Sequence, residues 1–421
     1  MRHGGCITPM SLDWLSLGAL AVAIVVSCTT TLNVGVLSLT LAWIVGVYFG
    51  GMTVGELVGG FPVQLFLTLA GVTLLFTQAQ INGTLDKVTH RAVRLCRGNA
   101  GFLPIMFFFV ACVLASIGPG NIAAAALIAP LAMPAAARAG VPVFLMAIMV
   151  GNGASSGSLS PFAPTGIIVN GIMANIGLPG YEFATYSNNL MVHVVVAFTG
   201  YLLLGGWRLF SRSSSAASDK PVDTTHLEGK HWVTLAVIGS LITGVLLFDV
   251  NVGMGAFGGA TFLALLRFAD HKEAVKRMPW AVIVMVCGVT VLISLLQRTQ
   301  GLELFTSILA GMATSDTITG VMAFVTGIIS VYSSTSGVVL PAFLPTVPGL
   351  IEQLGGGDAI AIASSMNIGG HLVDVSPLST IGALCIAAIP RSEDPQALFN
   401  KLLAWGLSMS VVGGIVCYLL F

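Results

Sequence analysis

Long apolar stretches fill most of this chain of 421 residues, and they constrain its fold more than any other feature. A helix needs about 20 apolar residues to cross the ~30 Å hydrocarbon core of a bilayer. Hydrophobic residues make up 56% of the chain and charged residues 8%, whereas soluble proteins carry roughly 25% charged residues. The sequence therefore predicts an all-α polytopic membrane protein and excludes a soluble enzyme. The net charge of zero indicates no nucleic-acid partner.

Ten stretches are predicted to cross the membrane once each: Trp14–Val26, Val34–Gly50, Pro62–Ala79, Val143–Ile176, Leu190–Phe210, Val233–Phe248, Val252–Phe268, Trp280–Leu296, Ala359–Ile389 and Leu398–Phe421. Four shorter stretches form two pairs, Leu103–Ser116 with Ile122–Ala137 and Val321–Tyr332 with Val338–Leu350. The first of these covers only about 21 Å as a helix, and a turn rich in Gly, Pro or Ser separates the members of each pair. We therefore predict two re-entrant hairpins that enter the bilayer and return.

The basic residues set the predicted orientation. Placing the segment after Ala79 in the cytoplasm puts 15 of the 17 Lys and Arg residues on that side and leaves only Arg2 and Arg298 outside. Cytoplasmic loops of membrane proteins carry such an excess of positive charge. The predicted topology is ten crossings and two hairpins in a bacterial inner membrane, with both termini outside.

The second half of the chain, 231–421, repeats the first, 1–210, across a polar linker at 211–230 that is predicted to be cytoplasmic. The matches, at a shift of about 211–218 residues, are Gly71-Val72-Thr73 with Gly288-Val289-Thr290, Asn82-Gly83 with Gln300-Gly301, Pro130 and Pro134 with Pro341 and Pro345, Asn152 with Asn367, Ser160-Pro161 with Ser376-Pro377, and Thr165 with Thr380. Each half crosses five times, an odd number, so we predict that the halves are inverted. Inverted repeats with interrupted helices are typical of secondary transporters.

Four polar clusters mark the places where the predicted helices break: the hairpin tips at 116–121 and 330–336, and the crossing breaks at 152–161 and 367–377. Backbone that leaves a helix at membrane depth lines a polar cavity or is buried in protein. New half-helices are predicted to begin near Ile122, Pro161, Val338 and Pro377, and four such N-terminal ends together favour an anion. Because the clusters contain no Lys or Arg, the anion would depend on amides, hydroxyls and co-bound cations such as Na⁺.

Two other classes of function are alternatives to a carrier. Gly153-Ala-Ser155-Ser-Gly157 fits the G-x-S-x-G pattern of serine hydrolases, with His193 or His371 as a conceivable base. That pattern requires a strand–turn–helix, whereas here it lies in a broken membrane helix, so an intramembrane serine hydrolase is only a remote alternative and the chain is predicted not to be an enzyme. A channel is the other alternative, distinguished by flux that does not saturate.

The run from Gly151 to Gly171, GNGASSGSLSPFAPTGIIVNG, resembles that of MatC-type dicarboxylate carriers. More broadly, the chain resembles the divalent anion–sodium symporters of the ion transporter superfamily over nearly its whole length. The resemblance implies a homodimer with a fixed scaffold domain and a hairpin-containing transport domain, each drawn from both repeats, that moves as an elevator. It also implies uptake of C3 or C4 dicarboxylates driven by Na⁺.

In that family the hairpin tips carry Ser-Asn-Thr and contact both the substrate carboxylates and Na⁺. Here the first tip has Gly120 and Ile122 on either side of its Asn, and the second tip has no Asn. The residues predicted to bind substrate are Gly120, Asn121, Ser160, Pro161, Thr165, Ser333, Ser334, Thr335, Ser336, Ser376, Pro377 and Thr380. Those predicted to bind the ion are Ser116, Asn121, Asn152, Ser330, Thr335, Asn367 and Asp374.

Asp374 is the only carboxylate in the four clusters, and an intramembrane carboxylate marks a functional site by default. It is predicted to ligate Na⁺; the alternatives are that it carries a coupling proton, shared with His371, or that it caps a helix. The predicted function is Na⁺-coupled symport of a small dicarboxylate such as malonate or a C4 acid. An H⁺-coupled carboxylate carrier and a cation/proton antiporter of the same superfamily are the alternatives.

Overall fold

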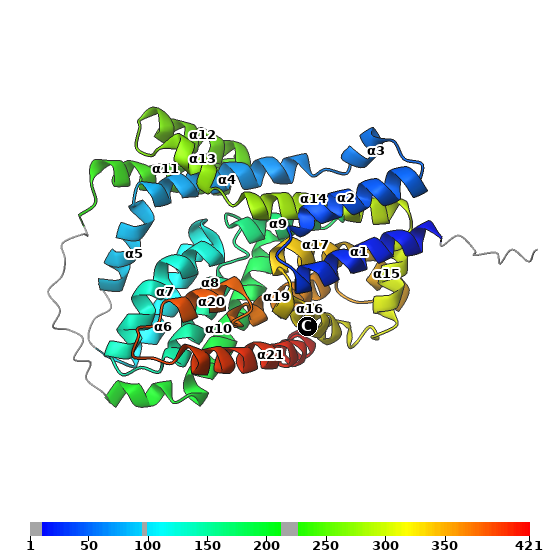
Figure 1. Ribbon diagram of the computed structural model, residues 1–421. Coiled ribbons are helices and arrows are strands. Elements are labelled where there is room, and N and C mark those ends of the chain that lie inside the picture. Colours follow the sequence, from blue (N-terminus) through cyan, green and yellow to red (C-terminus); the bar gives the residue numbers. More distant parts are fainter. Residues whose placement is uncertain (1–10, 95–98, 212–225) are drawn as a thin grey trace, which may run out of the picture.

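The computed structural model describes residues 11–94, 99–211 and 226–421. Arg2 and most of the predicted linker lie outside this range. Every regular element in the described part of the chain is helical, with no β-strand, which confirms the predicted all-α class (Figure 1).

The elements follow the predicted stretches closely. Those of the first half are α1 (Leu12–Thr29), α2 (Val34–Trp43) with a π-helical extension (Ile44–Phe49), α3 (Val54–Val58), α4 (Val63–Ile81), α5 (Thr84–Arg94), α6 (Phe102–Ile117), α7 (Gly120–Arg138), α8 (Val143–Ser156), α9 (Pro164–Asn175), α10 (Glu182–Leu203) and a 3-10 turn (Gly206–Ser211). Those of the second half are α11 (Gly229–Phe248), α12 (Val252–Leu265), α13 (His271–Arg277), α14 (Trp280–Arg298), α15 (Gly301–Ala310), α16 (Ile318–Tyr332), a π-helical turn (Thr335–Val339), α17 (Leu340–Phe343), a 3-10 turn (Leu344–Thr346), α18 (Val347–Leu354), α19 (Ala359–Leu372), a 3-10 turn (Val373–Val375), α20 (Thr380–Ala387) and α21 (Pro395–Leu420).

Among the described residues, seven helices are long and apolar enough to cross a membrane. They include α7 and the continuous helical run Thr335–Leu354, both of which were predicted to be arms of hairpins that do not cross. Shorter apolar helices such as α6 and α8 accompany them. The chain is thus a multi-span membrane protein, while the count of ten crossings and the depth of the hairpins stay predictions.

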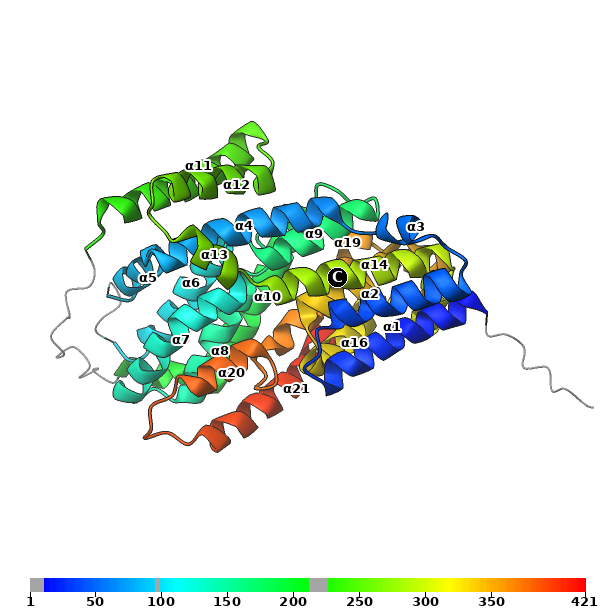
Figure 2. The same cartoon turned by 45° about the horizontal axis from the view of Figure 1, so that its top comes forward.

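The helices form two bundles, each drawn from both halves of the sequence (Figures 1 and 2). The first bundle contains α1, α2, α4, α11, α12 and α14, and the second contains α6, α7, α8, α10, α16, α19, α20 and α21. Between them lie α9, which packs on α4, and the run Thr335–Leu354, which packs on α14. Short helices α5 and α15 lead from the first bundle to the second.

Corresponding helices of the two halves make corresponding contacts in the first bundle. A side chain on Gly71 of α4 would meet the backbone carbonyl of Gly253 of α12, and one on Gly288 of α14 would meet the carbonyl of Gly35 of α2. The absence of a side chain lets these helix backbones approach closely, as at other membrane helix crossings. Such paired crossings are what an internal repeat requires; the inversion of the halves stays a prediction.

Helix lengths follow the same correspondence. Helices α4 and α14 each have 19 residues, and α8 and α19 each have 14. After α8 and after α19 the chain leaves the helix, turns, and begins a short second helix, α9 or α20. The sequence therefore located both breaks correctly.

The half-helices after these breaks begin three residues later than predicted. Helix α9 starts at Pro164 instead of Pro161, and α20 starts at Thr380 instead of Pro377. In each break the intervening residues form a tight turn against the new helix. A side chain on Gly382 would meet the Ser376 carbonyl. The turn needs the extra residues, so neither Ser-Pro pair forms a helix N-terminus.

This packing gives a stability prediction. Gly382→Ala places a methyl group against backbone atoms of Ser376 and Val375, and we expect a loss of about 1–3 kcal/mol, typical of overpacking. Gly239→Ala is the matched control, because a methyl group there would meet nothing within 4 Å. The midpoint of thermal unfolding in detergent measures both. An unchanged midpoint in Gly382→Ala would contradict the tight turn.

Hydrogen bonds and ion pairs connect the start of α5 to α11. Asn82 donates through Nδ2 to Thr234 Oγ1 at 2.8 Å, and its carbonyl accepts from His231 Nε2 at 3.1 Å. Glu228, the residue before α11, bridges Lys87 at 3.0 Å and Lys230 at 3.2 Å. Hydrogen bonds from these two ammonium groups lower the pKa of Glu228. These interactions hold one end of α5 against the first bundle.

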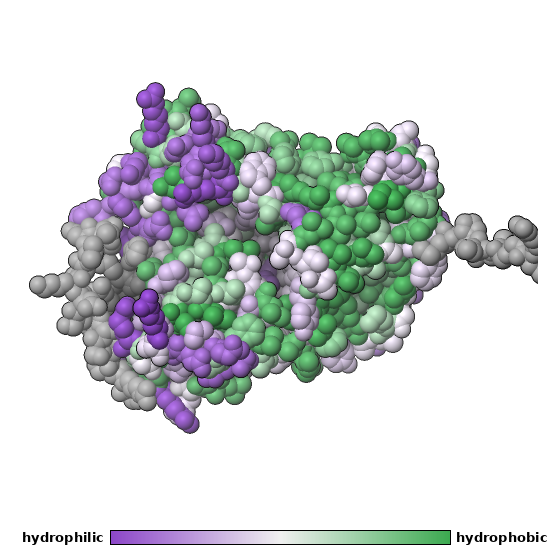
Figure 3. Space-filling view, in the orientation of Figure 1, coloured by the Kyte–Doolittle hydropathy of each residue, from purple (hydrophilic) through white to green (hydrophobic). Residues whose placement is uncertain are grey.

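The face of the molecule in Figure 3 is mostly apolar, and hydrophilic residues gather at one end of it, around α5, α13, the start of α11 and the connection from α20 to α21. An apolar girdle with a polar end is what a bilayer-embedded protein presents, because lipid tails solvate apolar side chains. Lys87, Lys230, Lys272 and Lys276 belong to these elements. Which end faces the cytoplasm stays a prediction.

Candidate functional site

The first hairpin tip is a glycine-dependent turn between α6 and α7. Gly118 and Gly120 have φ angles of 147° and 82°, which are strained for a residue with a side chain. Asn121 follows and is 8% exposed, and its Oδ1 accepts a hydrogen bond from the backbone N–H of Ile122 at 3.0 Å. This bond orients the side chain and leaves its NH₂ group as a donor for a ligand.

The second tip is a serine-capped helix start. Helix α16 ends at Tyr332, and Ser333 and Ser334 connect it to the run that begins at Thr335. Ser334 Oγ accepts from the backbone N–H of Gly337 at 3.1 Å, which is the bond that an N-cap serine makes. The helix starts at Thr335, three residues before the predicted Val338, and Ser334, which was predicted to bind substrate, is its N-cap.

Thr335 connects this tip to the break after α19. Its Oγ1 lies 2.9 Å from Asp374 Oδ1 and 3.3 Å from the carbonyl of Gly370. An ionised Asp374 can only accept, so the Thr335 hydroxyl then donates to it. If Asp374 carries a proton, the bond can reverse, because Thr335 can then donate to Gly370 instead. The pair therefore accommodates either charge state of Asp374.

A cavity of about 240 Å³ lies at the junction of the two tips and the second break. It is lined by Asn121, Ile122, Tyr332, Ser333, Ser334, Thr335, Ser336, His371, Asp374, Leu378, Ser379, Thr380 and Ile381. Its volume is just below the ~300–1,000 Å³ of pockets for drug-sized ligands, so it suits a smaller molecule. Three of the four predicted clusters meet here.

Some features of this cavity favour a bound anion, and others favour a bound cation. Helix α7, the run from Thr335 and helix α20 all begin at its wall, and N-terminal N–H groups of helices favour anions. Asp374, only 7% exposed, is the one carboxylate in the lining, and no Lys or Arg is among the lining residues. The cavity can therefore hold an anion provided that a cation or proton compensates Asp374.

The first crossing break does not reach this cavity. Ser160 is buried and donates through Oγ to the Ser116 carbonyl at 2.7 Å, tying the break to the first tip. Ser116 Oγ in turn lies 2.7 Å from the Cys112 carbonyl and 2.9 Å from Tyr186 Oη. Only three of the four predicted helix ends therefore converge, and the fourth, at α9, lies behind the first tip.

Several other predicted substrate residues also lie outside the cavity wall. They are Gly120, Pro161, Thr165, Ser376 and Pro377. Ser376 is fully buried and is turned towards Gly406 of α21, while its Oγ lies 3.4 Å from the backbone nitrogen of Leu378. These positions shape the turns that carry the lining residues.

Three predicted ion ligands have buried polar side-chain atoms without a hydrogen-bond partner. Asn152 and Asn367 are fully buried, and Asn152 Oδ1, Ser330 Oγ and both side-chain polar atoms of Asn367 have no hydrogen-bond partner. Such atoms carry a desolvation cost of about 1–3 kcal/mol each unless a ligand, ion or water satisfies them. Three of these atoms are amide or hydroxyl oxygens, which are the kind of ligand that Na⁺ takes, and no group of three His, Cys, Asp or Glu among the described residues offers a transition-metal site.

Helix α10 supplies Asn189, a functional candidate that the sequence analysis missed, and His193, which it considered only as the base of a hydrolase. Asn189 donates through Nδ2 to the carbonyls of Ser155 and Ser156, the last residues of α8, at 2.9 and 3.4 Å. One turn later, His193 Nδ1 donates to the Asn189 carbonyl at 2.9 Å, and the ring also lies beside the backbone of His371. Their spacing of four residues near the start of an apolar stretch was the available signal.

The G-x-S-x-G motif does not form a hydrolase site. Ser155 lies inside α8, is fully buried, and its Oγ has no hydrogen-bond partner. The imidazoles of His193 and His371 donate to backbone carbonyls of their own helices. Ser155 therefore has neither a general base nor access to a substrate.

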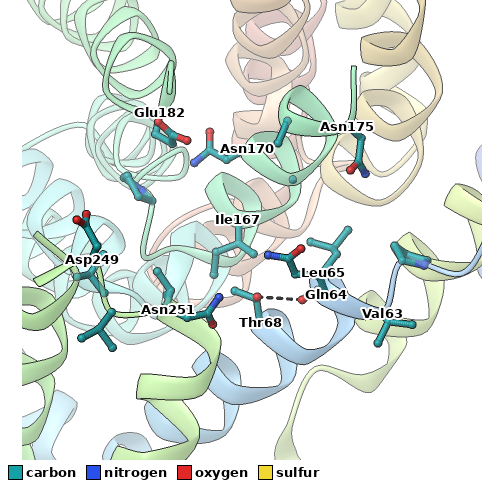
Figure 4. Close-up of a pocket in the computed structure, with 17 residues that line it drawn as sticks. Val63, Gln64, Leu65, Thr68, Ile167, Asn170, Asn175, Glu182, Asp249 and Asn251 are labelled. Atoms are coloured by element: carbon teal, nitrogen blue, oxygen red, sulfur yellow. Dashed lines mark hydrogen bonds between the residues drawn. The ribbon is translucent and has the colours of Figure 1, made fainter. Parts of the chain in front are cut away.

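A second, larger cavity of about 680 Å³ is lined by residues of the first bundle and of α9 (Figure 4). Gln64 and Thr68 of α4 and the α11–α12 turn with Asp249 and Asn251 line one side, and Asn170, Asn175 and Glu182 face them. Of the predicted site residues, Pro161 is the one that borders it. This space lies between the first bundle and the facing residues of α9 and the start of α10.

Comparisons with known proteins agree with this architecture. Residues 10–158 match the family model of the dicarboxylate carrier protein MatC N-terminus. No curated protein sequence matches the chain. The YdaH transporter of Alcanivorax borkumensis has 12% sequence identity and a TM-score of 0.57, with 97% of each chain covered. MtrF of Neisseria gonorrhoeae, described within a class of antimetabolite efflux pumps, has 12% identity and a TM-score of 0.58, with 98% of this chain and 95% of MtrF covered.

The family match confirms the resemblance to MatC-type carriers over residues 10–158. At 12% identity, the two structures show a shared fold that extends over nearly the whole chain. Together, the carrier family and the transporter fold support a membrane transporter and not an enzyme.

Proposed function

We propose that this chain is a secondary active transporter of small dicarboxylates, such as malonate or a C4 acid, coupled to Na⁺. The observation that supports this proposal most directly is the 240 Å³ cavity, in which three helix N-termini and one buried carboxylate meet and no Lys or Arg is among the lining residues. Asn121, Ser333, Ser334, Ser336 and Thr380 are assigned to the substrate. Asp374 and Thr335 are assigned to the coupling ion.

The anionic substrate is supported by the helix ends. The first backbone N–H groups of a helix have no acceptor within the helix, and Thr380 and Ile381 at the start of α20 line the cavity. No side chain caps this helix end. A carboxylate is the small anion that both the donors and the family match favour.

Cation coupling is supported by Asp374. A buried carboxylate next to a bound dicarboxylate would be strongly unfavourable unless a positive charge compensated it. Na⁺ fits the hydroxyl and carboxylate oxygens of Thr335 and Asp374. A proton is the second candidate, favoured by the reversible Thr335 bond and by His371 in the same cavity wall.

The two bundles support an elevator mechanism, in which the first is the fixed scaffold and the second carries the substrate. Helices α5 and α15 would be the connecting arms, and the cavity between α9 and the first bundle would provide room for movement. A homodimer and an inner-membrane location with both termini outside complete the proposal. The hydrophilic end around α5 and α13 would face the cytoplasm.

Uptake into proteoliposomes tests the proposal. Radiolabelled malonate, succinate and citrate are offered at fixed pH with Na⁺ or choline outside, and then without Na⁺ under an imposed pH gradient. We expect saturable uptake of malonate or succinate that requires Na⁺. Full uptake in choline that a protonophore abolishes would assign H⁺ instead. Exchange of Na⁺ for H⁺ without carboxylate uptake would indicate an antiporter, and no flux under any gradient would contradict a carrier.

Cross-linking across the larger cavity tests the elevator movement. In a background without the seven native cysteines, Asn170→Cys and Asn251→Cys place thiols on opposite sides of the cavity. We expect a bis-maleimide cross-link to stop exchange while substrate binding, measured by thermal shift, persists. Each single-cysteine variant treated with the same reagent is the control. Undiminished exchange by the cross-linked protein would show that the bundles do not move here.

A further inference from the structure

One hydrogen bond links a helix of the first bundle directly to the second hairpin tip. Ser27 Oγ of α1 lies 2.7 Å from Ser333 Oγ, although the two residues are 306 positions apart in the chain. Ser333 lines the 240 Å³ cavity and is the neighbour of Ser334, which caps the helix from Thr335. Ser27 lies outside all four predicted clusters, and it does not line the cavity.

Helix α14 holds the same tip from a second direction. A side chain on Gly337 would meet the Sδ atom of Met285 at 2.8 Å, so the methionine packs against the backbone of the tip. The contacts of this segment with the first bundle therefore include a hydrogen bond to α1 and an apolar contact with α14. A displacement of the second tip away from α1 must break the Ser27–Ser333 hydrogen bond.

The corresponding place in the other half of the chain has no such contact. Gly35 of α2 and Gly253 of α12 make equivalent close approaches in the two halves, so residues of this region correspond at a shift of 218 positions. At this shift, Val245 of α11 occupies the position that Ser27 occupies in α1. Valine has no hydroxyl group, and Val245 borders the 680 Å³ cavity. The polar contact is thus specific to the second tip, because the residue at the equivalent position of the other half cannot form it.

We propose that Ser27 is a positioning residue for transport: its hydrogen bond to Ser333 holds the second tip against α1 in one conformation and breaks when the second bundle moves. This inference rests on the proposed carrier function. A neutral hydrogen bond shifts a two-state equilibrium by about 2- to 12-fold. Ser27 therefore influences how often the tip uncovers the cavity without touching the substrate.

A disulfide in place of the hydrogen bond tests whether the contact breaks during transport. The distance between the two Oγ atoms is compatible with a disulfide in the double variant Ser27→Cys/Ser333→Cys, in the cysteine-free background. We expect oxidation in membranes to form this bond and to stop exchange, and dithiothreitol to restore the rate of the reduced variant. Absence of the disulfide, or exchange at an equal rate in the oxidised and reduced protein, would overturn the proposal.

The control pair is Thr29→Cys/Ser333→Cys. Thr29 is also near the end of α1, but it is exposed and its Oγ1 donates to the Val25 carbonyl of its own helix at 2.8 Å. We expect no disulfide from this pair. Efficient cross-linking of both pairs would show non-specific mobility of the tip and would also overturn the proposal.

A labelling measurement separates this inference from the carrier proposal, because it requires no substrate. Leu378 lines the cavity and is 48% exposed, so Leu378→Cys reports access to the cavity through its rate of reaction with a water-soluble maleimide. We expect Ser27→Ala to raise this rate by about 2- to 12-fold, Ser27→Thr to restore it, and Thr29→Ala to leave it unchanged. An unchanged rate in Ser27→Ala would overturn the role of Ser27 while leaving the carrier proposal intact.

Discussion

Asp374→Asn is expected to abolish cation-driven uptake while leaving the protein folded. The substitution keeps the size of the side chain and its ability to accept from Thr335 Oγ1, but it removes the only negative charge in the cavity lining. A hydrogen bond or ion contact to a charged group contributes about 1.5–3 kcal/mol, which corresponds to a loss of about 10- to 150-fold in ion affinity. Initial uptake rates over a range of Na⁺ concentrations measure this loss.

The control for this experiment is the oligomeric profile and thermal unfolding of the purified variant. We expect both to match the unmodified protein, because the amide replaces a buried charge by a neutral group. If Asp374→Asn takes up dicarboxylate with an unchanged dependence on Na⁺ and pH, the carboxylate is only a structural partner of Thr335. A variant that exchanges substrate but has lost its response to a pH gradient would identify Asp374 as the proton carrier.

Asn121→Ala and Thr335→Ala are each expected to reduce uptake by about 10- to 150-fold, because each removes one hydrogen bond to a charged partner. Asn121 contributes the free NH₂ group at the first tip, and Thr335 contributes the hydroxyl group next to Asp374. Uptake at low substrate concentration, with substrate affinity measured separately by thermal shift, shows whether binding is the step affected.

Two further substitutions make this test specific. Thr335→Ser keeps the hydroxyl group, and we expect it to retain most of the uptake. Thr326→Ala removes a buried hydroxyl group that bonds only within α16, to the carbonyls of Met322 and Ala323, and we expect little change in uptake. Normal transport by both tip variants would mean that the tips only terminate helices.

Much of the fold could be predicted from local patterns in the sequence. Apolar stretches predicted the helices, and runs of Gly, Ser and Asn predicted where helices stop, because such residues favour turns and caps over helix interiors. The second tip is an example: a run of Ser and Thr predicted that a helix stops there, although the new helix begins at Thr335 and not near Val338. The pairing of Thr335 with Asp374 was only partly foreseen, since both were assigned to the ion site without any indication that they touch.

The residues that the sequence analysis missed act through contacts between distant segments. Asn189 was overlooked because its partners, the carbonyls of Ser155 and Ser156, are backbone atoms of another helix. Ser27 was overlooked because its partner lies 306 residues away. Neither contact leaves a local pattern in the chain.

By itself, the sequence determined that the chain forms membrane helices, where those helices break, and that a single carboxylate lies among the breaks, because hydrophobicity and helix-breaking residues act locally. The tertiary structure alone decided that three helix ends and not four meet at the cavity, since Ser160 turns to the Ser116 carbonyl. It also decided that α20 begins at Thr380, because the turn packs against Gly382. Both outcomes depend on backbone approaches between segments that the linear order of residues does not specify.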